Sequence, residues 1–525
     1  MTNSLLLPFT ASSSIERTGG KAYNLSELTR AGFPVPPGFT ITTDAYLLIT
    51  QQLDLAPLLD ELEQTKEPER LAELAARMRA RIHEAPIPKE LEQTIIQAYR
   101  QLGPSQPVAV RSSATSEDLP FASFAGQQDT YLNIVGEAAV LDAVRRCWAS
   151  LWTERAVSYR AKNGIDPHTV RLAVVVQRLI DSRVAGVLFT ANPLTGKRRQ
   201  AVIDASPGLG EAVVSGAVNP DHFVVDTLAG RILERHIGEK QLQIRATAGG
   251  GTERVALSSA NEACVSDEQI RELARLGQRV EQHYGAPQDI EWSIDVQGKL
   301  WLLQARPITT LYPLPADAPD SDDKLRVYFS LNVVQGVFRP FTPLGSSLLK
   351  RVGTAIATFL GMPPATPEPT FLKDAGMRLF LDMTTPLRNV VARQLLIALM
   401  GSAESRTQPI FKQLVQDKRL SLTRTSRGAS LLFTLRILLR LRLPSRILRG
   451  MLRPEQAVQM RATLLAELER TLQVPASCDR SPTARQHRGL LRQNAPIHRA
   501  HHSISRRGYA LNAADKQTAE RACHR

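Results

Sequence analysis

The spacing of apolar residues alternates between strand-like and helix-like patterns over residues 1–315. Short runs rich in Val and Ile predict strands, and apolar residues three or four positions apart predict helices. The predicted strands cover residues 108–110, 172–179, 186–190 and 200–205, and the predicted helices cover residues 21–30, 54–101 (broken near Pro86 and Pro88), 142–160 and 262–283. Two further segments, 222–236 and 289–306, predict hairpins. This mixture predicts an α/β (α+β) fold.

The second hairpin has the sequence DIEWSIDVQGKLWLLQAR, from which a register can be derived. A two-residue turn at 297–298 would place Glu291 opposite Gln304 and Asp289 opposite Arg306. Because side chains alternate between the faces of a strand pair, Glu291, Gln304 and Arg306 would share one face. The apolar residues of the other face are predicted to join a core: Ile290, Trp292, Ile294, Trp301, Leu303 and Ala305.

A carboxylate, an amide oxygen and a guanidinium on one face suit a magnesium–polyphosphate group. Mg²⁺ prefers hard oxygen ligands, and a guanidinium binds phosphate through a fork of donors. The alternative is a solvated sheet face that carries an ordinary salt bridge.

Other segments combine glycine with groups that bind anions. Lys21 follows Gly19-Gly20 at a predicted helix start, where backbone amides and an ammonium could meet one anion. Arg111 follows a predicted strand, and residues 126–130 predict a glycine-bearing turn with amide and hydroxyl donors. Taken singly, each segment is more often a routine turn. The P-loop and Rossmann fingerprints are missing, so a nucleotide site here must have another design.

Composition is that of a globular protein, with 43% hydrophobic and 22% charged residues, and it excludes collagen-like and wholly disordered chains. The four cysteines form no CxxC pair, so neither a disulfide framework nor a zinc site is predicted. The first residues lack the basic region of a secretory signal, and no apolar run is long enough for a spanning helix. We therefore expect a cytoplasmic chain.

Charge is distributed unevenly along the chain. Residues 1–315 contain 32 Lys and Arg against 36 Asp and Glu, a balance of −4, whereas residues 316–525 contain 33 against 15, a balance of +18. The basic stretch 431–453 has three interpretations: a substrate-domain helix with solvated arginines, an amphipathic helix on a membrane surface or partner, or a nucleic-acid-binding segment. No recognised nucleic-acid motif accompanies it, so we expect no specific nucleic-acid partner.

Five segments resemble the pyruvate phosphate dikinase and phosphoenolpyruvate synthase family. They are GGKAYNLSELTRAGFPVPPGFTITTDAY (19–46), VRSSATSEDLPFASFAGQQDTYLNI (110–134), CWASLWTERAVSYR (147–160), SRVAGVLFTANPLTG (182–196) and QDIEWSIDVQGKLWLLQARPITTL (288–311). The resemblance implies an ATP-grasp ATP-binding domain over residues 1–315. The following segment LRVYFSLNVVQGVFRPFTPLG (325–345) is most similar to the rifampin phosphotransferase branch, in which a substrate-binding domain comes next.

The resemblance also implies roles for single residues. Lys21 and Arg111 match the residues that hold the ATP phosphates, and Arg306 matches a phosphate clamp. Glu291 and Gln304 match magnesium ligands. The other matched nucleotide contacts are Gly126, Thr130 and Gln177, the last of which corresponds to an adenosine contact.

In the family reaction, ATP yields AMP and phosphate while its β-phosphoryl group passes to a histidine on a separate domain. That histidine then phosphorylates pyruvate or another small acceptor. The family's histidine lies in a segment reading roughly Gly-Gly-x-x-Ser/Thr-His-x-Ala, and none of the ten histidines here has that context. We therefore expect no catalytic residue in this chain, and a histidine domain on a separate chain becomes a candidate partner.

The rest of the chain divides by pattern. Residues 316–330 predict a linker, 331–474 a partial, mainly helical substrate-binding-like domain, and 475–525 a basic, divergent or disordered tail, hypothetically the product of a truncation or frameshift. Two functions remain open. One is the ATP-binding part of a dikinase-type phosphotransferase that cannot complete turnover alone. The other is an ATP-binding pseudoenzyme or regulatory module whose basic C-terminal half binds a partner.

Overall fold

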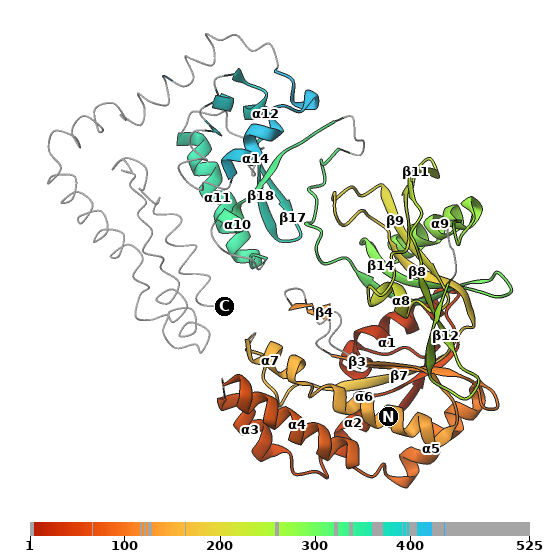
Figure 1. Ribbon diagram of the computed structural model, residues 1–525. Coiled ribbons are helices and arrows are strands. Elements are labelled where there is room, and N and C mark those ends of the chain that lie inside the picture. The colour runs from red at the N-terminus through yellow and green to blue at the C-terminus, as the bar shows by residue number, and fades with distance from the viewer. Residues whose placement is uncertain are drawn as a thin grey trace, which may run out of the picture. The chain divides into compact units, whose positions relative to one another are not determined.

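The computed structural model describes residues 5–422, together with Leu435, with gaps at 66, 116–117, 120–121, 124–128, 163, 258–261, 320–323, 335–339, 360–370, 391, 395 and 398–406. The chain forms two compact units, Met1–Tyr312 and Pro313–Arg525 (Figure 1). Gly126 and the predicted tail 475–525 lie outside the described residues, as does the basic stretch 431–453 apart from Leu435.

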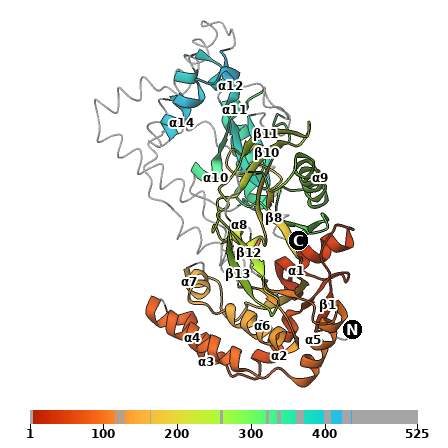
Figure 2. The ribbon, with the colours of Figure 1, turned by 45° about the vertical axis from the view of Figure 1, so that its right-hand side comes forward.

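The first unit begins with an antiparallel sheet of five described strands, in the order β1-β2-β7-β3-β6. The strands are β1 (Leu6–Pro8), β2 (Gly38–Ile41), β7 (Leu172–Arg178), β3 (Val108–Ala114) and β6 (Thr130–Ile134). One face of this sheet buries an apolar core against helices. These helices are α2 (Thr43–Thr50), α3 (Ala56–Gln64), α4 (Pro68–Glu84), α5 (Lys89–Leu102), α6 (Glu137–Ser150) and α7 (Glu154–Lys162). Figures 1 and 2 both show α2–α6 on the side of the sheet that faces away from β8.

A second antiparallel sheet of six described strands has the order β11-β10-β9-β8-β14-β15. Its strands are β11 (Arg231–His236), β10 (Asp221–Asp226), β9 (Gln200–Pro207), β8 (Ser182–Phe189), β14 (Gln288–Asp295) and β15 (Leu300–Pro307). Helix α9 (Asp267–Tyr284) packs on it and begins with a complete capping box at Ser266. Smaller elements complete the unit: β4 (Asp118–Leu119), β5 (Ala122–Ser123), α8 (Glu211–Val214), β12 (Leu242–Ala246) and β13 (Thr252–Ala256).

Helix α1 (Ile15–Arg30) lies between the two sheets (Figures 1 and 2). Its apolar residues Ala22, Leu25 and Leu28 are buried in one cluster with Val175 of β7 and with residues of β14 and β15. Gly19 interrupts the helix with φ 70° and ψ 169°, a conformation open essentially to glycine alone. The regular helix therefore begins beside Lys21, as the Gly-Gly-Lys sequence predicts.

The β14–β15 hairpin confirms two predicted pairs and corrects the turn. Glu291 lies opposite Gln304 and Asp289 opposite Arg306. The predicted two-residue turn is wrong, because the loop runs through 296–298, with Gly298 at φ 86°. A β-bulge between Glu291 and its neighbour restores the register that the longer loop had shifted by one residue.

This bulge also corrects the predicted core of the hairpin. Leu303 is half-buried and not a core residue, whereas Leu302 is fully buried opposite Trp292. Trp301 remains buried, but it lies opposite Ser293.

The remaining predicted elements of the first unit are largely confirmed, so its class is mixed α/β with antiparallel sheets. Strands β3, β8 and β9 are longer than the predicted segments 108–110, 186–190 and 200–205, whereas β7 ends one residue before the predicted 179. The 222–236 hairpin is present as β10 and β11. The predicted helix 142–160 is wrong in one respect: it is two helices, α6 and α7, that meet between Ser150 and Glu154.

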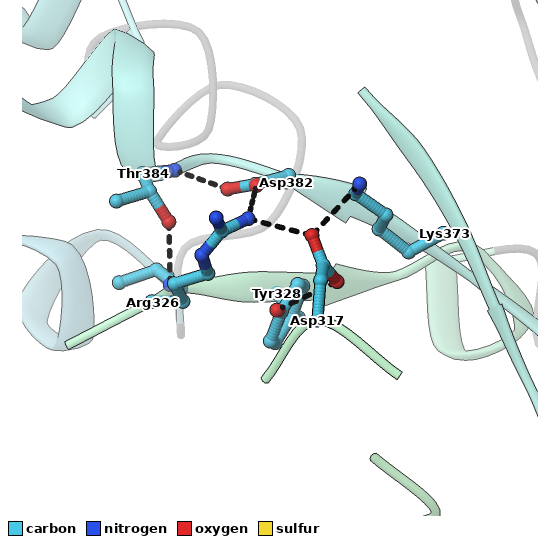
Figure 3. Close-up of polar contacts among 7 residues, drawn as sticks. Asp317, Arg326, Tyr328, Lys373, Asp382 and Thr384 are labelled. Atoms are coloured by element: carbon cyan, nitrogen blue, oxygen red, sulfur yellow. Dashed lines mark hydrogen bonds and ion pairs between the residues drawn. The ribbon is translucent and has the colours of Figure 1, made fainter. Parts of the chain in front are cut away.

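The described part of the second unit contains a small antiparallel sheet in the order β16-β18-β17 together with helices. Its elements are β16 (Tyr328–Ser330), β18 (Arg378–Asp382), β17 (Leu372–Ala375), α10 (Leu331–Val334), α11 (Pro343–Phe359), α12 (Thr384–Leu387) and α14 (Thr407–Leu414). Figure 3 shows how Asp317 is tied to this sheet. Asp317 accepts hydrogen bonds from Arg326 at 2.7 Å and from Lys373 at 2.8 Å, and Arg326 also reaches Asp382 at 3.1 Å.

Within the part of the chain that the structure describes, no helix combines the length and apolar character needed to cross a membrane.

Replacing Gly19 with alanine tests the turn before Lys21. A Cβ atom there would lie 2.2 Å from the carbonyl oxygen of Ser113. The backbone of an alanine at this position would also be strained, because φ is positive. We expect Gly19→Ala to lower the free energy of unfolding by about 3 kcal/mol, measured by urea denaturation. Gly32→Ala is the matched control, since Gly32 has φ 78° but an open surrounding, and it should cost about 1 kcal/mol. Equal losses for both variants would contradict the close-approach argument.

Candidate functional site

The candidate site lies where α1 and β3 meet the β14–β15 hairpin. Lys21 occupies the first regular turn of α1, and Arg111 lies in the middle of β3. Glu291 comes from β14, and Gln304 and Arg306 come from β15. Segments that are nearly 300 positions apart in sequence therefore contribute side chains to one region.

Arg111 makes the direct connection between the two sheets. One terminal nitrogen, Nη2, donates to Oε2 of Glu291 at 2.6 Å, and the other, Nη1, donates to the carbonyl oxygen of Leu303 at 3.1 Å. The side chain of Arg111 is 11% exposed and that of Glu291 is 23% exposed. The two charges are therefore largely removed from water and neutralise one another.

Electrostatic surroundings keep Glu291 ionised. Burial raises the pKa of this carboxyl, but the positive charges of Arg111, Lys21 and Arg306 lower the pKa by more, so the net shift is downward. The positive charges of Lys21, Arg111 and Arg306 thus all act on the Glu291 carboxylate.

Lys21 is held by the backbone of β3. Its Nζ donates to the carbonyl oxygen of Ser112 at 3.1 Å. The neighbouring Ser113 hydroxyl is fully buried, donates to the carbonyl of Thr18 at 2.8 Å and accepts from the amide of Ala22 at 3.1 Å. Ser113 therefore fastens both sides of the Gly-Gly-Lys turn to the first sheet.

Gln304 carries one of several buried side-chain polar atoms that lack a hydrogen-bond partner within the described part of the chain. The residue is 4% exposed, and its Oε1 is buried without a hydrogen-bond partner among the described residues. A buried carbonyl oxygen without a partner is costly, and such a group calls for a specific explanation. Together with the Glu291 carboxylate opposite, this oxygen is a suitable ligand for a hard cation such as Mg²⁺.

Arg306 lies on the same face but has a partner of its own. Its guanidinium donates to Oδ2 of Asp289 at 2.8 Å. Burial raises the pKa of the Asp289 carboxyl; Arg306 lowers that pKa and Glu291 raises it, and the net shift is upward. Asp289 thus holds the guanidinium of Arg306, which lies directly opposite it on β15.

The two other predicted nucleotide contacts that the structure describes lie on strands β6 and β7 of the first sheet. Thr130 is exposed at the start of β6, directly opposite Arg111 in the strand register. Gln177 is buried near the end of β7, where its amide donates to the carbonyl of Pro36 at 3.4 Å. Gly126 lies outside the described residues.

Sequence reasoning missed two polar residues that hold the site together, Ser113 and Asn24. The Asn24 amide donates to the carbonyl oxygen of Ala305 at 3.0 Å. A signal was present in the sequence: Asn24 follows Lys21 by three positions, so the two share a helix face. For Ser113 the sequence offers no comparable indication beyond its position two residues after Arg111.

Removing the Arg111 charge should destabilise the fold by an amount that depends on pH. Because the folded-state pKa of Glu291 lies below its ordinary value, this carboxyl stabilises the fold above its unfolded-state pKa and loses that effect as the pH falls. In Arg111→Met we expect a higher Glu291 pKa and a loss of about 2 kcal/mol at pH 7, less than for a fully buried pair because Glu291 retains some solvent contact. The loss should shrink toward pH 4, as measured by urea denaturation at each pH.

The double variant Arg111→Met/Glu291→Gln is the control for this experiment. It removes the ionisable carboxyl, so its stability relative to Glu291→Gln should not vary with pH. A pH-independent loss in Arg111→Met would show that the pair is not the source of the effect.

Comparisons with known proteins agree on one family. Residues 15–325 match the family model described as pyruvate phosphate dikinase, AMP/ATP-binding domain. A rifampicin phosphotransferase of Streptomyces sp is 42% identical over 77% of this chain and 45% of its own length, and one of Bacillus subtilis is 40% identical over 76% and 44%. The phosphoenolpyruvate synthase of Pyrococcus furiosus is 43% identical over 56% of this chain and 42% of its own.

The chain spans less than half the length of these curated relatives. The matched family model, in contrast, covers more than half of the chain and includes all the candidate site residues. The chain therefore belongs to the pyruvate phosphate dikinase AMP/ATP-binding domain family.

Proposed function

We propose that residues 1–315, as an ATP-grasp domain, bind ATP together with Mg²⁺ and form the ATP-binding part of a dikinase-type phosphotransferase. The observation that carries this proposal is the 2.6 Å bond from Arg111 to Glu291, which lies opposite Gln304. The charges of Lys21 and Arg306 act on the same carboxylate. Positive charges beside an acid and a buried amide oxygen match what a metal-bound polyphosphate requires.

Each cation has a proposed role on the phosphates. Lys21, in the first regular turn of α1, binds as a compact charge. Arg111 and Arg306 present planar forks that can hold two phosphate oxygens each. Thr130, Gln177 and Gly126 are proposed nucleotide contacts on the family match alone, with Gln177 toward the adenosine.

Glu291 and Gln304 are the proposed protein ligands of Mg²⁺. Mg²⁺ in phosphoryl-transfer sites commonly takes one or two protein ligands and completes its shell with phosphate oxygens and water. A pair of oxygens on adjacent strands is therefore sufficient. The metal would neutralise phosphate charge as the transferred group leaves.

Binding of the metal nucleotide would exchange the partners of the Arg111–Glu291 pair. The guanidinium would pass from the carboxylate to phosphate, and the carboxylate would pass from the guanidinium to the metal. Neither charge would then be left alone, so the exchange avoids the cost of an unpaired buried ion.

The acceptor and the histidine are also matters of proposal. In the family scheme the β-phosphoryl group passes to a histidine and then to a small molecule, and the relatives' names point to an antibiotic or to pyruvate. The ten histidines of this chain lack the family's context, so we propose that a separate histidine-bearing domain receives the group.

The second candidate is an ATP-binding module without turnover whose basic C-terminal half binds a partner. The charge balance of +18 over residues 316–525 favours it. AMP formation separates the two candidates. With Mg²⁺ and ATP, the phosphotransferase should form AMP when the histidine domain of a relative is added, whereas the module should bind ATP and form none.

Replacing Arg111 or Lys21 with alanine should weaken ATP binding. Loss of a charge-assisted contact costs about 1.5–3 kcal/mol, which corresponds to roughly a 10- to 150-fold higher Kd measured by calorimetry with Mg²⁺ present. Arg100→Ala is the control, because Arg100 is exposed and pairs with Glu137 on the helical side of the first sheet. An unchanged ATP affinity in Arg111→Ala would remove Arg111 from the site.

A further inference from the structure

The outer edge of β15 is where the second sheet meets the rest of the first unit. β15 is the last described strand of its sheet, so no described strand pairs with its outer backbone groups. Three bonds use this edge: Leu302 N–H donates to the carbonyl of Pro34 at 2.8 Å, Arg111 donates to the carbonyl of Leu303, and Asn24 donates to the carbonyl of Ala305. The edge is thus fastened beside the two site residues that β15 carries.

Among these three contacts, the one from Asn24 lies closest in sequence to both site residues of β15. The carbonyl that it binds belongs to the residue between Gln304 and Arg306. On its own helix Asn24 follows Lys21 by one turn, so both side chains lie on one face. One hydrogen bond therefore links the helix that carries a candidate phosphate-binding cation to the strand that carries the candidate metal ligand and clamp.

Asn24 is also held from a second direction. Its backbone carbonyl accepts a hydrogen bond at 3.1 Å from the hydroxyl of Tyr284, the last residue of α9, which packs on the second sheet. Ser113 fastens the start of the same helix to the first sheet. Lys21 thus lies between the Ser113 anchor to the first sheet and the anchor that the Asn24 amide makes to the second sheet at Ala305. The Tyr284 bond goes to the Asn24 backbone and does not involve that amide.

We propose that Asn24 is a positioning residue of the nucleotide site: through its bond to Ala305 it fixes the Lys21 ammonium relative to Gln304 and Arg306. This inference rests on the proposed function. The apolar contacts of α1 hold the helix against the two sheets, but such contacts are non-directional and do not fix its rotation. A hydrogen bond weakens steeply with angle, so it also fixes the rotation of the helix about its axis.

The test is Asn24→Leu, which removes the amide, keeps the same number and branching of side-chain heavy atoms, and adds no charge. We expect ATP affinity with Mg²⁺ to fall about tenfold by calorimetry. In a Lys21→Ala background the same substitution should change the affinity less than about twofold, since the cation that Asn24 positions is gone. Equal losses in both backgrounds would overturn the proposal, because a general structural effect does not depend on Lys21.

Tyr284→Phe is the matched control. It removes the other hydrogen bond of Asn24 and leaves the amide in place. We expect it to retain the ATP affinity of the unaltered chain, and a tenfold loss in this variant as well would overturn the specific role of the amide. If Asn24→Leu does not fold, Asn24→Ala replaces it with the same expected outcomes.

A second measurement needs no nucleotide. Modification of Lys21 by an amine reagent, followed by mass spectrometry of its peptide, reports the surroundings of the ammonium. The rate should rise several-fold in Asn24→Leu and stay unchanged in Tyr284→Phe, and an unchanged rate in Asn24→Leu would overturn the proposal. If the unaltered chain binds no ATP while this rate responds, the proposed function fails and the positioning contact stands.

Discussion

The pairing of Arg111 with Glu291 is the interaction on which the site depends. Arg111 belongs to the first sheet and Glu291 to the second, and their bond of 2.6 Å is formed largely out of water. A buried ion pair adds little net stability, because desolvation offsets most of its attraction, yet loss of one partner is strongly unfavourable. The pair therefore constrains how the sheets meet more than it stabilises either one.

The same guanidinium also binds the backbone at Leu303, and this contact depends on the β-bulge. An extra residue in β15 is left outside the regular ladder and bends the strand locally. The carbonyl of this residue accepts from Arg111. The bulge thus gives Arg111 a second partner and returns Gln304 to the position opposite Glu291. One irregularity in the ladder serves both the electrostatic contact and the register of the candidate metal ligands.

The hairpin shows what the sequence could and could not predict. The register of Glu291 with Gln304 was predicted correctly, although the turn was wrong by one residue and the bulge compensated for it. Periodicity could not locate the bulge, because residues 300–303 are all apolar and have no alternation to interrupt. The elements of the first unit follow from local patterns, whereas the meeting of α1 with β15 joins residues 281 positions apart and follows from none.

Helix α1 combines two kinds of contact with different consequences. Ala22, Leu25 and Leu28 are buried among apolar groups of both sheets, and this burial supplies attraction without specifying a rotation. Small rotations of a helix move a side chain such as that of Lys21 sideways while changing the buried area little. The polar contacts of Ser113 and Asn24 oppose such rotations because their geometry is directional. Burial therefore places the helix between the sheets, and two hydrogen-bonding side chains decide where its cation points.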